Sequence, residues 1–77
     1  MKTLEEFVEL FAEQFDDTDA NEITADTRFR DLDEWSSLVG LSVIAMVDEE
    51  CGVLLKGEDM RQANTPAELF EIVKNKM

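Results

Sequence analysis

Apolar residues follow helical spacing near the beginning of the chain and again near its end. The first stripe lies among glutamates and comprises Leu4, Phe7, Val8, Phe11 and Phe15. This spacing predicts an amphipathic helix over residues 3–15. Thr3 is expected to cap the helix, because Glu6 stands three positions later, as in a capping box.

The last stripe starts directly after a helix-initiation signal. In Thr65-Pro66-Ala67-Glu68, the threonine suits the cap, the proline suits the first helical position, and the glutamate completes a second capping box. The apolar face that follows comprises Leu69, Phe70, Ile72 and Val73. Lys74 and Lys76 come next, where the negative end of the helix dipole favours cations. These features predict a C-terminal helix.

Between these stripes, the stretch DEWSSLVGLSVIAMVDEE at residues 33–50 joins two adjacent serines to an almost continuous apolar run. Ser36 is a good N-cap, which places Ser37 in the first turn of a helix. The helix is predicted to continue to about Cys51 and to end at Gly52. Its apolar residues fall into two rows, one of Leu38, Leu41 and Ala45 and one of Val39, Val43, Met46 and Val47.

The remaining segments are connections. The long polar connection at residues 16–27 and its continuation are expected to be pinned to the core by three spaced apolar residues, Ile23, Phe29 and Leu32. Residues 53–62 form an apolar link followed by a turn with a short helix. There is no strand pattern. We therefore predict a single all-α domain over residues 1–77, a small bundle of three main helices plus one short helix, with a long first loop.

Charge and composition narrow the set of functions. The chain has a formal net charge of −12, which disfavours nucleic acid and anionic membranes and favours partners with basic patches. The single cysteine, Cys51, excludes an internal disulfide, and the lack of histidine disfavours zinc and haem sites. Met1-Lys2-Thr3 leads directly into the first helical pattern, without a signal peptide or membrane-spanning run. We therefore expect a cytoplasmic monomer that does not insert into membranes.

Part of the polar connection resembles a calcium-binding loop. Asp17, Asp19 and Asn21 match the first three ligand positions. However, Glu22 stands where the loop needs glycine, and Arg28 stands where it needs a bidentate glutamate. We therefore predict a solvated loop and no metal site.

The two serines pose the main functional question. A serine nucleophile needs a base, and this chain has no histidine, so self-catalysed chemistry at either serine is disfavoured. Ser37 would lie at the positive end of the helix dipole, among unpaired amides, which is a place that suits a phosphate group. Capping alone explains Ser36. We expect no catalytic residue, although the geometry can host a phosphoester on Ser37.

With these features the chain resembles an acyl carrier protein over nearly all of its length. The resemblance rests on the first amphipathic helix, the long loop, the Thr-Pro-capped last helix and four short motifs, Phe29-x-x-Leu32, Ser37-Leu38, Asp48-Glu49-Glu50 and Gly52-Val53. It implies that Ser37 carries 4'-phosphopantetheine, attached by a separate phosphopantetheinyl transferase. The arm would hold acyl groups as thioesters for fatty acid, lipid or polyketide biosynthesis, and the carrier itself would not be an enzyme.

The chain departs from the family pattern around the serine. Ser36 replaces the motif aspartate, and Val39 and Ser42 stand where acids are usual. Trp35 is also unusual beside the modified serine. These differences leave open a specialised carrier with its own partners, which would dock more through apolar contact and less through charge.

The excess hydrophobicity of the middle helix predicts a partner surface. We expect an exposed strip that runs from Ser37 and comprises Leu38, Leu41, Ala45, Asp48 and Glu49. Acyl-loading and acyl-processing enzymes with basic or apolar docking surfaces would bind there. The core-facing residues are expected to be Val43, Met46 and Val47, packed against Phe7, Phe11 and Ile72.

Two alternatives stay open at the level of the sequence. A carrier of the same fold could be loaded with an amino acid, as in aminoacyl or D-alanyl carrier systems. An unmodified acidic helical adaptor, in which the serines only cap, would have the same composition.

Gly40 stands inside the predicted middle helix, where glycine is unfavourable. Its missing side chain leaves room for Trp35 or the arm, permits close helix packing, or is simply tolerated.

Overall fold

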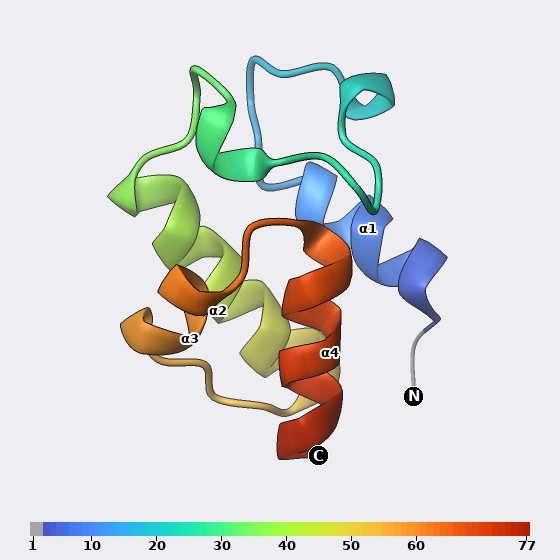
Figure 1. Cartoon of the computed structure of the whole chain (residues 1–77), viewed down its shortest axis with the longest axis vertical. Helices are drawn as coiled ribbons and strands as arrows, with labels where there is room; N and C mark the ends of the chain where they lie inside the picture. The colour runs from blue at the N-terminus through green and yellow to red at the C-terminus, as the bar shows by residue number, and fades with distance from the viewer. Residues whose placement is uncertain (1–2) are drawn as a thin grey trace.

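The computed structural model describes residues 3–77, and Met1 and Lys2 of the expected domain lie outside the described residues. The described part is all-α, as predicted. Its elements are α1 (Leu4–Ala12), η1 (Ala20–Glu22), η2 (Phe29–Asp31), α2 (Ser37–Cys51), α3 (Gly57–Gln62) and α4 (Pro66–Lys76), where η marks a short 3₁₀ turn. The long connection from α1 to α2 crosses one end of the bundle, opposite the C-terminus (Figure 1). No helix within residues 3–77 is both long and apolar enough to span a bilayer.

The first helix begins as predicted but ends three residues early. The Thr3 hydroxyl accepts from the Glu6 amide at 3.2 Å, and the Glu6 carboxylate accepts from the Thr3 amide at 2.9 Å, which confirms the capping box. α1 ends at Ala12 because the amides of Gln14 and Phe15 bond three residues back, as in a tighter turn. Phe15 therefore lies outside the helix, yet its side chain is still buried.

The core is built from aromatic rings of α1 and aliphatic side chains of α2. Phe7 packs against Phe70 of α4 with ring centroids 5.2 Å apart, and Phe11 packs against Phe29 at the same distance. On α2 the buried side chains are those of Val43, Met46 and Val47, as predicted. Ile72 is only half-buried and packs at the edge of this core.

The long connection is fastened to the bundle, as its apolar residues predict. Ile23 and Phe29 are buried, and Leu32 is half-buried against the core. Backbone bonds join the connection to the start of α4 and the residues before it. The Phe29 amide donates to the Asn64 carbonyl, and the Ala67 amide, in the first turn of α4, donates to the Ala25 carbonyl. This attachment determines where the chain enters α2.

The cap of the last helix differs in one detail from the predicted capping box. The Thr65 hydroxyl accepts from the Glu68 amide at 3.1 Å, and Pro66 occupies the first turn, as predicted. The Glu68 carboxylate, however, accepts from the amide of Asn64 at 2.7 Å and not from that of Thr65. The extended backbone of Thr65 brings the preceding amide within reach of Glu68. Lys76, near the end of α4, forms an ion pair with Asp59 of α3 at 3.4 Å.

Candidate functional site

The two serines divide their roles at the start of α2. Ser36 has an extended backbone, and its hydroxyl accepts from the Val39 amide at 3.4 Å, so it is the N-cap, as predicted. Ser37 is the first residue of the helix and its side chain is exposed. The first backbone bond of the helix runs from the Gly40 amide to the Ser36 carbonyl at 2.9 Å. The Ser37 hydroxyl is therefore accessible to another enzyme.

The electrostatics at Ser37 suit an anionic substituent. The first amides of a helix lack carbonyl partners within it, and the helix dipole places partial positive charge there. The first turn of α2 contains no acidic residue that would oppose a phosphate group. A phosphoester on Ser37 would thus be stabilised by the helix itself.

A groove opens beside the serines, between the N-terminal half of α2 and α3. Its volume is about 330 Å³, and its lining residues are Trp35, Ser36, Ser37, Gly40, Leu41, Ile44, Gly57 and Met60. None of these described lining residues is charged, and most are apolar. An arm attached to Ser37 would start at the edge of this mostly apolar groove.

Trp35 forms one wall of this groove. Its ring lies 4.6 Å from that of Phe29, and it contacts Phe11 and Phe15 at 6.5 and 6.2 Å between centroids. The ring also approaches Gly40, where an added Cβ would lie 3.6 Å from the Trp35 Cζ2 atom. Trp35 thus joins the hydrophobic core to the N-terminal end of α2, and it approaches the helix at its one interior glycine.

Gly40→Ala tests whether this space is used. A Cβ at 3.6 Å makes ordinary van der Waals contact, so alanine should fit without moving Trp35. We expect the variant to be more stable by up to about 1 kcal/mol, because alanine favours helix where glycine does not. Urea unfolding measures this gain. Slower modification of the serine, or a shift in Trp35 fluorescence, would show instead that the missing side chain serves the site.

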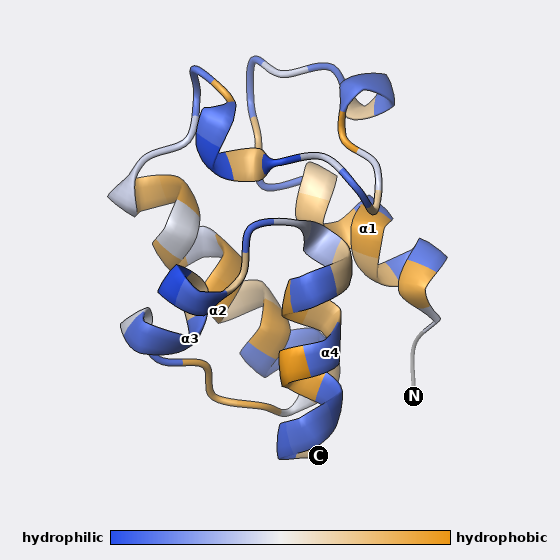
Figure 2. Cartoon of the chain, in the orientation of Figure 1, coloured by the Kyte–Doolittle hydropathy of each residue, from blue (hydrophilic) through white to orange (hydrophobic). Residues whose placement is uncertain are grey.

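The predicted docking residues lie together on the outer face of α2. Leu38 is 75% exposed and Leu41 is 63% exposed, and they lie one turn apart, so they form an exposed apolar pair. Ala45, Asp48 and Glu49 are exposed as well. Figure 2 shows α2 as apolar along most of its length and hydrophilic at its end, whereas α4 alternates. The structure thus leaves this strip accessible, and its role in partner binding stays a prediction.

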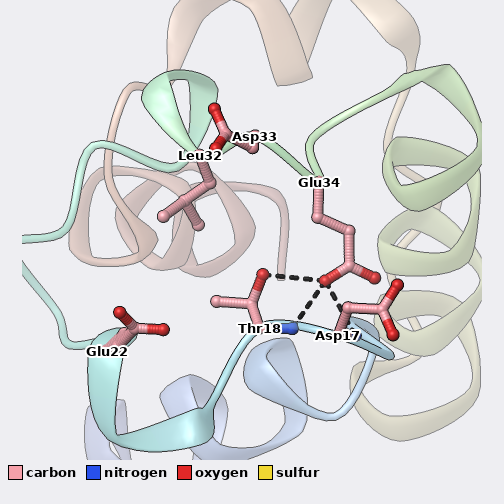
Figure 3. Close-up of a pocket in the computed structure, with 6 residues that line it drawn as sticks. All are labelled: Asp17, Thr18, Glu22, Leu32, Asp33 and Glu34. Atoms are coloured by element: carbon pink, nitrogen blue, oxygen red, sulfur yellow. Dashed lines mark hydrogen bonds between the residues drawn. The ribbon is translucent and has the colours of Figure 1, made fainter.

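Glu34, just before the serines, holds a role that the sequence analysis missed. One carboxylate oxygen accepts from the Asp16 amide at 2.6 Å. The other accepts from the Asp17 amide at 3.0 Å and from the Thr18 amide and hydroxyl at 2.8 and 2.7 Å. Figure 3 shows the side chain reaching across an acidic hollow toward Thr18.

These hydrogen bonds set the charge state of Glu34. Partial desolvation raises the pKa of its carboxyl, but the Thr18 hydroxyl and the amides of residues 16–18 together lower that pKa below its ordinary value. Glu34 is therefore an ionised acceptor at neutral pH. No local motif could have identified it, because its partners lie 16–18 positions earlier in the chain.

In the loop that partly resembles a calcium site, the Asp19 side chain stabilises a turn. The Asp19 carboxylate accepts from the Asn21 amide at 2.9 Å and caps η1. Among the described residues, no cluster of three or more potential ligands has the geometry to hold a metal ion. Asp19 therefore has a structural role in this loop.

Comparison with known families agrees with this geometry. A protein-family model described as "Phosphopantetheine attachment site" matches residues 5–73. Neither the curated proteins nor the solved structures contain a significant match to the chain. The accessible serine at a helix N-terminus and the uncharged groove beside it fit 4'-phosphopantetheine, whose phosphate is anionic and whose arm is elongated. The chain therefore belongs to the phosphopantetheine-attachment family, whose members are carrier domains that bear 4'-phosphopantetheine covalently and are modified by a phosphopantetheinyl transferase.

Proposed function

We propose that Ser37 is the attachment residue and that the chain carries acyl intermediates as thioesters for fatty acid, lipid or polyketide biosynthesis. The observation that carries this proposal is the position of an exposed serine at the first residue of α2, at the edge of an uncharged groove. Ser36 is less suitable, because its hydroxyl already caps the helix.

The chemistry at Ser37 needs a second protein. The Ser37 oxygen forms a phosphoester with the pantetheine phosphate of coenzyme A, the pyrophosphate bond of coenzyme A breaks, and its nucleotide half leaves as adenosine 3',5'-bisphosphate. The proton of the serine hydroxyl passes to a base. The chain has no histidine, so the transferase supplies that base. The carrier contributes an accessible hydroxyl and a helix N-terminus that stabilises the phosphate charge. The carrier is accordingly a substrate of other enzymes and not an enzyme itself.

The groove favours an acyl cargo over an aminoacyl one. Leu41, Ile44 and Met60 provide an apolar lining that can contact an aliphatic chain. An aminoacyl group would carry an ammonium ion, whose burial is costly without a carboxylate partner. No carboxylate is among the described residues that line the groove.

Partner enzymes are proposed to bind the exposed strip on α2. The strip comprises Leu38, Leu41, Ala45, Asp48 and Glu49, and we call it the docking strip. Its apolar part lies nearest Ser37 and its acidic part at the far end of the helix. A loading or processing enzyme would therefore meet apolar contact beside the arm and charge attraction further away, from a surface that is itself apolar or basic.

Mass spectrometry of the protein from its native host tests the proposal. We expect intact mass and peptide mapping to place one phosphopantetheine on Ser37, and mild hydroxylamine to release an acyl hydroxamate. Release of an amino acid derivative would instead support the aminoacyl carrier. A protein that stays unmodified in the host, and is not modified by a transferase with coenzyme A, would support the acidic adaptor.

A further inference from the structure

Glu34 and Trp35 are neighbours in the chain, and both contact the segment that follows α1. The Glu34 carboxylate accepts the amides of residues 16–18, while the Trp35 ring packs on Phe15, directly before them. The segment before α2 is thus attached to the segment after α1 by two adjacent residues. Glu34 contributes charge-assisted hydrogen bonds, and Trp35 contributes a contact between aromatic rings. The next residues along the chain are the two serines.

The arrangement around Glu34 calls for a carboxylate. The three amides and the Thr18 hydroxyl are all donors, and they converge on both oxygens of one side chain. A glutamine could accept on one oxygen only, and its NH₂ group would face the Asp16 amide, donor against donor. Asp17, Glu22 and Asp33 line the same hollow, and no basic side chain is among its described lining residues. The three backbone amides and the Thr18 hydroxyl therefore compensate the Glu34 charge, in place of a basic side chain.

The segment that Glu34 holds forms the entrance to the attachment site. Trp35 is a wall of the groove next to Ser37, and its ring lies within van der Waals distance of the space above Gly40. A backbone bond from the Trp35 amide to the Leu32 carbonyl closes the turn before it, at 3.0 Å. Without the hydrogen bonds of Glu34, this turn would keep the bond between Trp35 and Leu32. It would lose the hydrogen bonds that connect it to residues 16–18, after α1.

Resting on the assignment of Ser37 above, we propose that Glu34 is a positioning residue for the modification of this carrier. Its carboxylate ties the turn at residues 16–18 to the segment before α2, and it thereby holds Trp35 and the start of α2 in the arrangement that the transferase binds. The Glu34 carboxylate bonds to residues 16–18 and is not among the residues that line the groove beside Ser37, so in this proposal it acts through Trp35.

Three variants of the full chain provide the test. Glu34→Ala removes all four bonds, Glu34→Gln keeps one acceptor oxygen, and Asp33→Asn is the matched control. Asp33 lines the same hollow, and its carboxylate accepts no hydrogen bond from another described residue. Each apo protein is modified by a phosphopantetheinyl transferase with coenzyme A at varied carrier concentration, well below its unfolding temperature. Trp35 fluorescence is recorded in the same samples.

We expect a graded loss that appears in KM and leaves kcat nearly unchanged. Glu34→Ala should raise KM for the carrier roughly tenfold and Glu34→Gln about threefold, because misplaced binding elements lose affinity before chemistry. Trp35 emission should shift to longer wavelength in the same order, with helical circular dichroism retained. Asp33→Asn should match the wild type in both measurements.

The possible failures are distinguishable. Wild-type kinetics and emission in Glu34→Ala would overturn the role of Glu34 and leave the proposed function intact. Equal losses in Glu34→Ala and Asp33→Asn would show a general charge effect and would also overturn it. A wild-type chain that the transferase does not modify at Ser37 would overturn the proposed function itself. In that case the emission of the variants would still show whether Glu34 holds Trp35.

Discussion

Ser37→Ala is expected to abolish attachment of phosphopantetheine completely while leaving the fold intact. The serine oxygen is the atom that would form the phosphoester, and alanine has no atom to replace it. The Ser37 side chain is exposed and caps nothing, so its loss removes no hydrogen bond that the structure shows. Incubation with a transferase and coenzyme A, followed by intact mass measurement, should give no mass increase. Circular dichroism and thermal unfolding should match the wild type.

Two neighbouring serines serve as controls for this result. Ser36→Ala should remain a substrate, but it should lose up to about 1 kcal/mol of unfolding free energy because the N-cap is gone. The capping bond is long, at 3.4 Å, which favours a small effect. Ser42→Ala removes another exposed hydroxyl of α2 and should change neither property. A mapped phosphopantetheine on Ser36 or Ser42 would show that the assignment of Ser37 is wrong.

Features that depend on nearby residues could be predicted from the sequence. The Ser36 cap, the end of α2 at Gly52 and the Thr3 capping box each involve groups only a few positions apart. Gly52 has a φ of 68°, in the left-handed region that glycine adopts without strain. The apolar rows also separated correctly, because the 3.6-residue period alone places Val43 and Val47 on one face.

Features that depend on distant contacts could not be predicted in this way. The pattern included Phe15 in α1, because a tighter turn keeps that side chain on the core side after the helix has ended. No local pattern distinguishes Glu34 from the other acids of the chain, and only the fold brings it to the amides of residues 16–18. The groove beside Ser37 likewise needs α3, whose position relative to α2 the pattern did not specify.

Truncation to alanine should affect stability strongly on the buried face of α2 and weakly on its exposed face. Val47 is fully buried, so Val47→Ala should lower the unfolding free energy by about 1–3 kcal/mol, through lost burial and the cavity that remains. Leu41 is 63% exposed, so Leu41→Ala should change stability by less than about 0.5 kcal/mol. Urea unfolding of both variants measures this contrast.

Partner binding should show the reverse order. Leu41→Ala should weaken binding of the transferase by on the order of tenfold, as expected for an apolar contact at the centre of an interface. The titration is made in a Ser37→Ala background, so that no modification occurs during it. Leu38→Ala should have a similar effect. Leu41 also lines the groove, whereas Leu38 is exposed and does not, so weaker binding of Leu38→Ala could not result from a change in the groove.

Leu54→Ala is the matched control for the docking strip. Leu54 is 68% exposed, close to the value for Leu41, but it lies in the link after α2. It should leave binding unchanged. Binding should also fall only gently with added salt, because screening acts on charge pairs and the first turn of α2 has no acid. The docking strip would be refuted by normal binding of the Leu38 and Leu41 variants. Equal weakening in Leu54→Ala would show that exposed apolar area, and not the outer face of α2, controls the affinity.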